Sequence, residues 1–522
     1  MDFLSFSFVY SVFCGAIILF ILKKLFSQPP PKFGKYAPSP SRLPIIGHLH
    51  LLAKFPDDPW KGFDAIRQQF GDVVSLKLGT CDTIMVSSLE TIKEVLINKA
   101  KIFSGRPDFY RYHLIFGGDR ENALALCEWS ELQKLRRSLC SISSTPKFAS
   151  TSYEMLDKAI TSEMGKFINL IESKPDRILT KCLVRQFSLN VFTEYLCASR
   201  MDYGNSTLIE QAYNFDFVFY DISQCGPLDF LPFLKTLGFF RGYIKKLNSI
   251  SKAVRVYVEE FLVKPRIAKM DKSSMLEGKM DLDSCDSMIS LDLMYKYHLQ
   301  NPEELSYDHF FFAIGDLVGG SSGITNLLMR IIGHLAMDME AQEEMYQEVL
   351  AAARQLDTDT ISIKHRPYTP LADASILEAL RLSSSPIVPH VPTQDTTIGE
   401  YFVPKGTMIL FNNWRMNFSS EFYTEPEKFQ PSRFLVHSTN NNSPNPWQIK
   451  KPEVFMPFSV GQRSCLGFKL TQNITFAALC NLLLRYKIEP VDPVETIREH
   501  VKMGILALRV DDCFRVQLIP RE

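Results

Sequence analysis

The sequence lacks an excess of charge of either sign. Its 522 residues include 58 Lys and Arg and 58 Asp and Glu. A nucleic-acid-binding domain carries a basic face, so this balance argues against a nucleic-acid partner. Internal repeats are missing too, and so are the glycine-rich fingerprints that bind flavin or nicotinamide dinucleotides. If the chain performs redox chemistry, its electrons therefore come from a separate protein.

The cysteines also lack a pattern. None of the eleven forms a CxxC pair, and their spacing is irregular. Such a set does not indicate a disulfide framework, and most are expected to be small buried side chains in a reducing compartment. The hydrophobic share, 46% of the residues, supplies a large core.

An apolar run from Phe3 to Leu22 predicts a membrane anchor over residues 1–24. As a helix at ~1.5 Å per residue it crosses a hydrocarbon core. A cleaved signal peptide needs basic residues before its apolar region, and a mitochondrial transit peptide is amphipathic and Arg-rich. Here Lys23 and Lys24 follow the run instead, which places the remaining chain in the cytosol. We therefore predict a single-pass protein of the endoplasmic reticulum membrane, although no retention motif is present.

The rest of the chain divides into a proline-rich linker, residues 25–47, and one large domain, residues 48–522. Helical periodicity dominates, and the fold class is mainly α with small β-sheets. Predicted helices are Ala341–Leu356, Leu371–Leu382 and a last one from Cys465 to Tyr486. Predicted strand regions are Val73–Leu78, Thr83–Val86, Thr396–Leu410 with a turn at 404–406, and a closing hairpin over Ile505–Ile519.

The segment Phe455–Gly467 carries the chemistry. Cys465 stands where a glycine-punctuated loop enters a predicted helix, whose first N–H groups stabilise a thiolate. Gly461 permits a tight turn, and Gly467 lets the backbone approach a flat ligand. Arg463 can pair with a carboxylate such as a haem propionate. A buried structural cysteine is the alternative for an isolated Cys at a helix start.

The spacing decides between these readings. Phe458, Gly461, Arg463, Cys465 and Gly467 match FxxGxRxCxG, and with this signature the chain resembles the cytochrome P450 superfamily over nearly everything after the anchor. The resemblance implies a single P450-type domain that binds heme b, iron protoporphyrin IX, with Cys465 as the axial ligand of the iron. A thiolate on haem iron favours cleavage of the O–O bond. It also implies electrons from NADPH through a cytochrome P450 reductase.

Two further family elements match. Glu378–Arg381 corresponds to ExxR, and Phe429–Phe434 corresponds to the later Pro/Arg segment. Glu378 and Arg381 lie three apart on one helix face, where they can form an ion pair that Arg433 joins. The resemblance gives this trio a structural role.

Three more residues are expected near the haem. Trp129 resembles the helix tryptophan that hydrogen-bonds a propionate. The family's arginine four residues later is Gln133 here, so Arg136 is expected to substitute, with Arg137 less well aimed. His390 resembles another residue that contacts a propionate. The alternative is that His390 is exposed or has its hydrogen bonds satisfied without a haem.

The oxygen-activating helix departs from the family. Its usual small-Gly-x-acid-Thr element is replaced in Ala313–Thr325, where both the acid and the threonine are absent in either possible register. Proton delivery then falls to Ser321, Ser322, Thr325, ordered water or a substrate hydroxyl. Three glycines also weaken this helix.

Several segments resemble the Spook-type (Halloween) enzymes of arthropod ecdysteroid synthesis: 104–113, 116–118, 123–130, 313–325 and 385–391. This resemblance implies a sterol substrate and an early oxidation step after 7-dehydrocholesterol. Residues 104–126, 313–325 and 385–391 are expected to line the pocket.

Three functions remain open. A sterol monooxygenase is the leading one. A haem-thiolate isomerase or dehydratase acting on an oxygenated lipid is favoured by the missing acid and threonine. A non-catalytic haem sensor or sterol-binding protein is the third.

Overall fold

The computed structural model describes residues 30–56, 58–222, 224–276, 285, 287–383, 387–440, 443–493, 501–503, 508–510 and 515–521. The predicted anchor lies outside these residues, and so do Ser385 and Pro386 of the predicted pocket lining. Among the helices of the described ranges, none has the length and apolar character needed to cross a bilayer.

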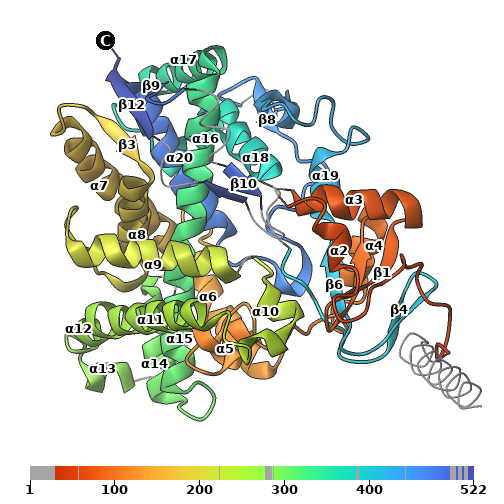
Figure 1. The fold of residues 1–522 in the computed structure, drawn as a ribbon. Coiled ribbons are helices and arrows are strands. Elements are labelled where there is room, and N and C mark those ends of the chain that lie inside the picture. Colours follow the sequence, from red (N-terminus) through yellow and green to blue (C-terminus); the bar gives the residue numbers. More distant parts are fainter. Residues whose placement is uncertain are drawn as a thin grey trace, which may run out of the picture.

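Long helices build most of the domain (Figure 1). They are α3 (Pro59–Phe70), α6 (Glu131–Ser144), α7 (Thr151–Glu172), α8 (Lys181–Cys197), α9 (Ser206–Ile222), α11 (Arg241–Tyr257), α14 (Ser290–Gln300), α15 (Tyr307–Gly319), α16 (Ser321–Met337), α17 (Met339–Gln355), α18 (Pro370–Leu382) and α20 (Phe468–Arg485). The three helices predicted near the C-terminal half correspond to α17, α18 and α20 within two or three residues at each end.

Shorter helical turns connect them. These are α2 (Leu49–Leu52), α4 (Leu89–Lys93), α5 (Tyr110–Ile115), α10 (Pro227–Phe230), α12 (Lys264–Ile267), α13 (Lys272–Leu276), α19 (Asn413–Phe418), the π-helical η1 (Glu94–Asn98) and η4 (Val258–Val263), and the 3₁₀ turns η2 (Arg120–Asn122), η3 (Pro232–Lys235), η6 (Ile363–Tyr368), η7 (Pro431–Phe434) and η8 (Gly461–Arg463).

The centre of the molecule is formed by α16 and α20, which pack against each other (Figure 1). Helix α20 is buried around its whole circumference, and polar residues such as Gln472, Asn473 and Asn481 are buried along with its apolar ones. A helix with no solvated face belongs in a core rather than on a surface. Both helices contribute to the largest hydrophobic cluster, together with α6, α7, α8, α15 and α18. The loop before α20 is therefore anchored on the most rigid part of the fold.

Small sheets lie at the edges. Strands β1 (Val73–Leu78) and β2 (Cys81–Val86) pair antiparallel, and β6 (Met408–Phe411) adds parallel to β2. Strands β4 (Thr396–Ile398) and β5 (Tyr401–Val403) form a hairpin, and β7 (Leu435–His437) pairs with β8 (Trp447–Ile449). The predicted early strands and the 396–410 strand region are confirmed, with a turn at Gly406 whose φ is +83°.

The predicted closing hairpin is wrong. Strand β11 (Leu508–Val510) pairs with β10 (Val501–Met503), whereas β12 (Arg515–Pro520) pairs with β9 (Tyr486–Pro490) and β3 (Ile178–Thr180). The alternating pattern indicated strands but carried no information about their partners, because long-range pairing is set by the position of α20 and α7 around them.

Part of the predicted linker is packed onto the domain. Lys35 forms a bridge with Tyr401, and Gly47 forms one with Leu78. Ala37 is buried. The folded region therefore begins before residue 48, and the prolines in this segment shape a chain that follows the β-sheet surface rather than a free spacer.

The predicted trio of Glu378 and Arg381 on α18 and Arg433 on η7 forms one buried network. The Arg381 Nε and Nη2 donate to the two carboxylate oxygens of Glu378 at 2.8 and 2.7 Å. The Arg433 Nε donates to Glu378 Oε1 at 2.9 Å, as does the Gln430 backbone N–H. The remaining donors of Arg381 and Arg433 reach backbone carbonyls, among them that of Asn417. The network thereby fastens η7 and the segment after α19 to α18.

We predict that Glu378→Ala lowers the free energy of unfolding by about 3–5 kcal/mol, because it leaves the buried charge of Arg381 without its partner. Chemical unfolding followed by circular dichroism measures this change. The matched control is Glu260→Gln, which removes one member of an exposed pair with Lys264 and should change stability by less than about 1 kcal/mol. Equal effects of the two substitutions would contradict a buried network.

Candidate haem site

The loop before α20 makes a tight turn. The Cys465 N–H donates to the Phe458 carbonyl at 2.9 Å, and the Ser464 N–H donates to the Gly461 carbonyl at 3.1 Å. Gly461 has a φ of +78°, and a Cβ there would lie 2.1 Å from the Leu96 carbonyl oxygen. Both the conformation and the space exclude a side chain, so the predicted requirement for glycine at 461 is confirmed.

Cys465 lies at the N-terminal end of α20, as predicted. Burial raises the pKa of its thiol, whereas a hydrogen bond from the Gly467 N–H and the charge of Arg137 lower the pKa. The side chain is nevertheless accessible to solvent. The sulfur can therefore be reached by a ligand. A metal cation at the sulfur deprotonates such a thiol outright.

Gly467 is the N-cap of α20. In the described chain, the nearest atom to a Cβ built on Gly467 is the Cys465 Sγ, at 4.0 Å. Neither the backbone conformation nor a protein neighbour therefore demands glycine at 467, in contrast to 461. The open space on this side matches the predicted close approach of a flat ligand.

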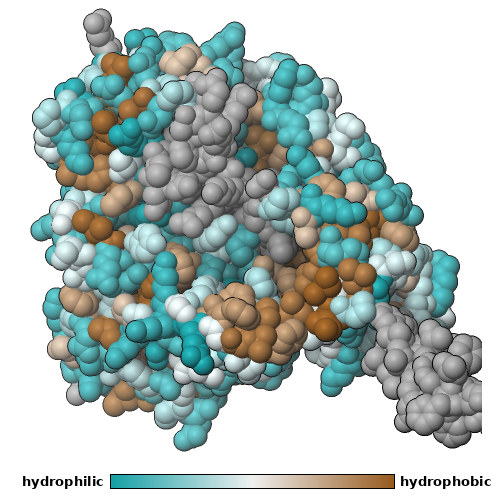
Figure 2. Space-filling view, in the orientation of Figure 1, coloured by the Kyte–Doolittle hydropathy of each residue, from teal (hydrophilic) through white to brown (hydrophobic). Residues whose placement is uncertain are grey.

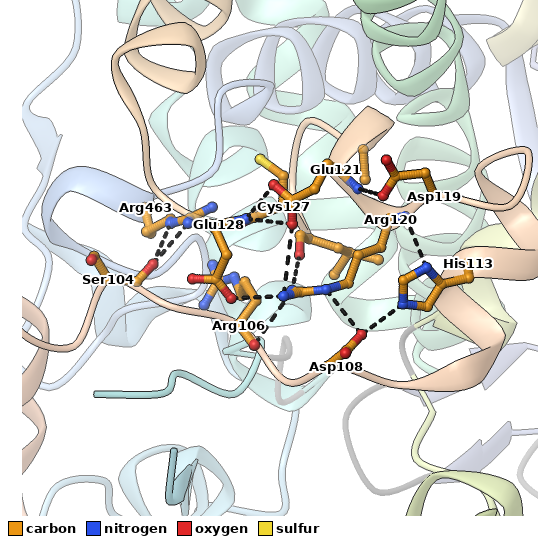
Figure 3. A network of polar contacts seen from close by, with 12 residues as sticks. Ser104, Arg106, Asp108, His113, Asp119, Arg120, Glu121, Cys127, Glu128 and Arg463 are labelled. Atoms are coloured by element: carbon orange, nitrogen blue, oxygen red, sulfur yellow. Dashed lines mark hydrogen bonds and ion pairs between the residues drawn. The ribbon is translucent and has the colours of Figure 1, made fainter. Parts of the chain in front are cut away.

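Arg463 has a partly satisfied guanidinium. Its Nη2 donates to the carbonyls of Ser104 and Cys127 at 2.7 and 2.8 Å, as Figure 3 shows. Its group also lies 5.0 Å over the ring of Trp129. The buried Nη1 has no hydrogen-bond partner among the described residues. Because buried donors are nearly always paired, this orphan N–H fits an anionic ligand such as a haem propionate.

Two further arginines surround this point. Arg106 is buried and donates to the carbonyls of Ala125, Val388 and Pro389. Burial lowers its pKa well below the usual value, and the nearby positive charge of Arg463 lowers it further. Arg137 donates to the Ser464 carbonyl at 2.5 Å, and burial lowers its pKa as well. Three desolvated cations in one place favour a ligand with more than one negative charge, and the two propionates of haem meet that requirement.

His390 lies in the same cluster. It is buried, and its Nδ1 donates to the Phe103 carbonyl at 2.6 Å, since a carbonyl only accepts. Burial lowers the pKa of the ring well below its usual value, and the charge of Arg106 acts in the same direction. With Nδ1 protonated, Nε2 can donate to a propionate only in the imidazolium form. A bound carboxylate would therefore have to raise the pKa of His390.

Trp129 and Arg136 occupy different positions relative to α6, and their expected contacts with haem stay predictions. Trp129 precedes Ser130, the N-cap of α6, and so does not lie on the helix. The Arg136 Nη1 and Nη2 donate to the carbonyls of Asn122 and Glu121 and to the Gln133 side chain. Arg136 thus holds the preceding loop together. Its neighbour Arg137, turned about 100° around the helix, is the one that reaches the Cys465 loop.

The loop held by Arg136 has a polar frame of its own. Arg120 forms ion pairs with Glu128 at 2.7 Å and with Asp108 at 3.0 Å (Figure 3). Asp108 also contacts the ring of His113. These contacts fix residues 104–128 as one unit beside Arg463.

The helix predicted to be weak is divided at Gly320, between α15 and α16. The N–H groups of Gly320 and Gly323 donate three residues back, to Leu317 and Gly320, each at 3.1 Å. A Cβ on Gly320 would lie 3.0 Å from the Leu317 carbonyl oxygen and 3.4 Å from the ring of Phe192. The break thus lets α8 pack closely against this point.

The three predicted relay hydroxyls lie just after the break, and all are buried. Thr325 donates its proton to the Ser321 carbonyl at 3.3 Å. That bond directs the hydroxyl back onto its own helix. Ser321 and Ser322 stay candidates for proton delivery, and Thr325 is the weakest of the three.

The segments expected to line a pocket meet in space. Gly105 and Val391 exchange two backbone hydrogen bonds, both at 3.0 Å. On the other side, the Leu124 N–H donates to Asp316 Oδ2 at 2.5 Å. Residues 104–126 therefore contact both 387–391 and α15.

Sequence reasoning missed two residues of this region, Arg106 and Asp316, and ranked Arg137 below Arg136. Arg106 gave no local signal, since arginines are common on exposed faces. Asp316 did give one, because it is the only charged residue between His309 and Arg330. A lone acid in so apolar a helix is rarely without a role.

Comparison with known proteins agrees with this geometry. The family model described as Cytochrome P450 matches residues 37–511. Cytochrome P450 307a1 of Drosophila melanogaster is 35% identical over 93% of this chain and 89% of its own length. Cytochrome P450 1A1 of Sparus aurata is 27% identical, over 92% and 91%. Human steroid 17-alpha-hydroxylase/17,20 lyase is 26% identical, over 88% and 87%. The chain therefore belongs to the cytochrome P450 family of haem-dependent monooxygenases.

Proposed function

We propose that the chain oxidises a sterol, an early ecdysteroid precursor such as 7-dehydrocholesterol, with dioxygen and with electrons that NADPH supplies through a separate reductase. The Spook-type segments support the substrate class, and so do the 35% identity to cytochrome P450 307a1 and the likeness to a steroid hydroxylase. The observation that carries the haem chemistry is the accessible thiol of Cys465 beside the buried Arg463 and Arg106 and the half-buried Arg137.

In this proposal, Cys465 would bind the haem iron through its sulfur. Arg463, Arg106, Arg137 and His390 hold the propionates, and Trp129 packs under the guanidinium of Arg463. A haem bound there supplies activation of dioxygen, which thiolate ligation promotes. The protein's own contribution is to bind the group, to keep the thiolate oriented by the Gly467 N–H, and to exclude bulk water.

On the substrate side, the proposal leaves proton delivery to Ser321 and Ser322 or to ordered water. Both serines lie within the first turn after the break at Gly320, where the helix makes fewer i→i−4 bonds. A substrate hydroxyl can also take part. The family's usual acid and threonine are missing here, so the pocket depends more on the groups its substrate brings.

We also propose that residues 3–22 anchor the chain in the endoplasmic reticulum membrane, with the catalytic domain in the cytosol. Exposed apolar side chains support a membrane-facing side: Leu43, Ile45, Phe233, Leu237 and Phe239. The last three are interspersed with exposed basic residues, as in interfacial membrane segments. Figure 2 shows apolar surface over the region of α10 and toward α2.

The ligand assignment is tested by Cys465→Ser. We expect haem-loaded protein of this variant to lose the reduced carbon monoxide band typical of thiolate ligation, because serine binds iron through oxygen. Cys127→Ser is the matched control, since Cys127 is a buried cysteine of the neighbouring loop and should leave the band in place. Survival of the band in Cys465→Ser would rule out the assignment.

The substrate class is tested by turnover of 7-dehydrocholesterol with reductase and NADPH, followed by mass analysis of the products. We expect products that gain oxygen from dioxygen, and no products when either NADPH or reductase is omitted. A rearranged product formed without reductase would instead indicate the isomerase or dehydratase.

The topology is tested by adding protease to intact microsomes that contain the full chain. We expect degradation of the catalytic domain without detergent, because the domain faces the cytosol. Protection until detergent is added would place it in the lumen and contradict the charge bias at Lys23 and Lys24.

A further inference from the structure

Asp316 is half-buried and carries a desolvated carboxyl group that the haem site does not use. Its Oδ2 accepts the Leu124 N–H at 2.5 Å, and the Ala125 N–H also donates to the carboxyl group. An ionised carboxylate offers about four acceptor positions. Two backbone donors therefore leave part of its hydrogen-bonding capacity unused.

The position of Asp316 is fixed relative to the haem site through one short loop. The Ala125 peptide donates its N–H to Asp316, while its carbonyl accepts from Arg106 Nε at 3.1 Å. Two residues on, the Cys127 carbonyl accepts from Arg463, which stands two residues before Cys465. Residues 123–127 thus join the arginine cluster to α15.

The carboxyl group is also reachable. Asp316 is half-buried and Ala125 is exposed, although the surrounding protein desolvates the carboxyl strongly enough to raise its pKa to about 6. Because Asp316 is not fully buried, a small polar group can approach its side chain. The surrounding helix is apolar from Phe310 to Val318 apart from Asp316 itself and Gly315.

Few charges act on Asp316. Among the described residues, Arg136 of α6 is the charged side chain that lowers its pKa, and the two loop N–H groups lower it as well. Cys140, also on α6, is a titratable neighbour whose own pKa Asp316 raises slightly. In the part of the chain that the structure describes, no charged side chain from another helix packed against α15 acts on its titration. Burial is the largest effect, so the group is an acid held in an apolar pocket.

We propose that Asp316 is a substrate-binding residue that accepts a hydrogen bond from a hydroxyl group of an otherwise apolar substrate. This inference rests on the proposed function, because it takes the interior space beside α15 as the sterol pocket. A neutral hydroxyl suits the site better than a cation, since Arg136 already balances the charge. The bond fixes which end of a rigid ring system approaches α15 and therefore which end is oxidised.

The two ionisation states predict a pH dependence. A hydroxyl that donates to the carboxylate binds the ionised form more tightly, so binding lowers the pKa of Asp316. Affinity is then lower when the carboxyl is protonated and rises as pH increases through about 6. A ligand without the donor gains nothing from the ionisation.

The experiment compares 7-dehydrocholesterol with its 3-O-methyl ether, which lacks the donor. Haem-loaded full-length enzyme is titrated with each from pH 5.5 to pH 8, and dissociation constants come from the optical spin-state change of the haem. At pH 8 we expect the ether to bind about tenfold more weakly, the effect of one hydrogen bond to a charged group. The difference should shrink toward pH 5.5.

Asp316→Asn keeps the shape and removes the ionisation. This variant should bind the two ligands within about threefold of each other, with no dependence on pH. Glu348→Gln is the matched control. Glu348 is likewise a half-buried carboxyl that accepts two consecutive backbone N–H groups, those of Leu371 and Ala372, and burial raises its pKa to about 7. It lies on α17, away from the pocket, so its variant should behave as the wild type does.

The outcomes separate the two proposals. Equal, pH-independent binding of both ligands to the wild type overturns the role of Asp316 and leaves the sterol function in place. If the pH dependence persists in Asp316→Asn and disappears in Glu348→Gln, the titrating group is Glu348. That result also overturns the proposed role of Asp316. Failure of the wild type to bind either sterol overturns the proposed function too. The wild-type comparison stands on its own if a variant does not fold.

Discussion

Buried positive charge beside Cys465 is the constraint on which the site depends. Arg463, Arg106 and Arg137 converge there, and burial lowers the pKa of each one. Their hydrogen bonds go largely to backbone carbonyls, which satisfy donors without neutralising charge. Such a cluster is costly for the protein alone and becomes favourable when a dianionic ligand binds. The fold is therefore most stable with its haem.

The loop of residues 121–128 connects the arginine cluster to α15. Arg136 donates to two backbone carbonyls of this loop, and Arg120 forms an ion pair with Glu128 at its end. Arg463 donates to the Cys127 carbonyl. Its N–H groups face Asp316 on α15. One side of the loop thus presents carbonyls to cations and the other presents N–H groups to a carboxyl. The haem side and the substrate side are consequently positioned by the same few peptides.

The break between α15 and α16 has a packing reason and a chemical consequence. A Cβ at Gly320 would crowd both the preceding turn and Phe192 of α8, so glycine suits the close approach of these helices. The same sequence that permits this approach has no acid or threonine in the usual place. The acid within this segment is Asp316, about two turns before the usual position. In the functions proposed above, proton delivery and substrate orientation therefore use other groups than the family's usual acid and threonine.

The sequence by itself determined the haem loop, the buried network and most of the helices. Those features are local: Gly461 needs its positive φ, Cys465 precedes a helix, and Glu378 faces Arg381 one turn away. Other features were decided only by the tertiary structure. Arg137 rather than Arg136 reaches the loop, β12 pairs with β9 and β3, and Ala125 joins Arg106 to Asp316. The physical reason is that a helical sequence pattern gives the spacing of side chains but not how the helix is rotated toward its neighbours. A strand pattern likewise gives which side chains share a face but not which strand pairs with it. Both are settled only when distant segments pack together.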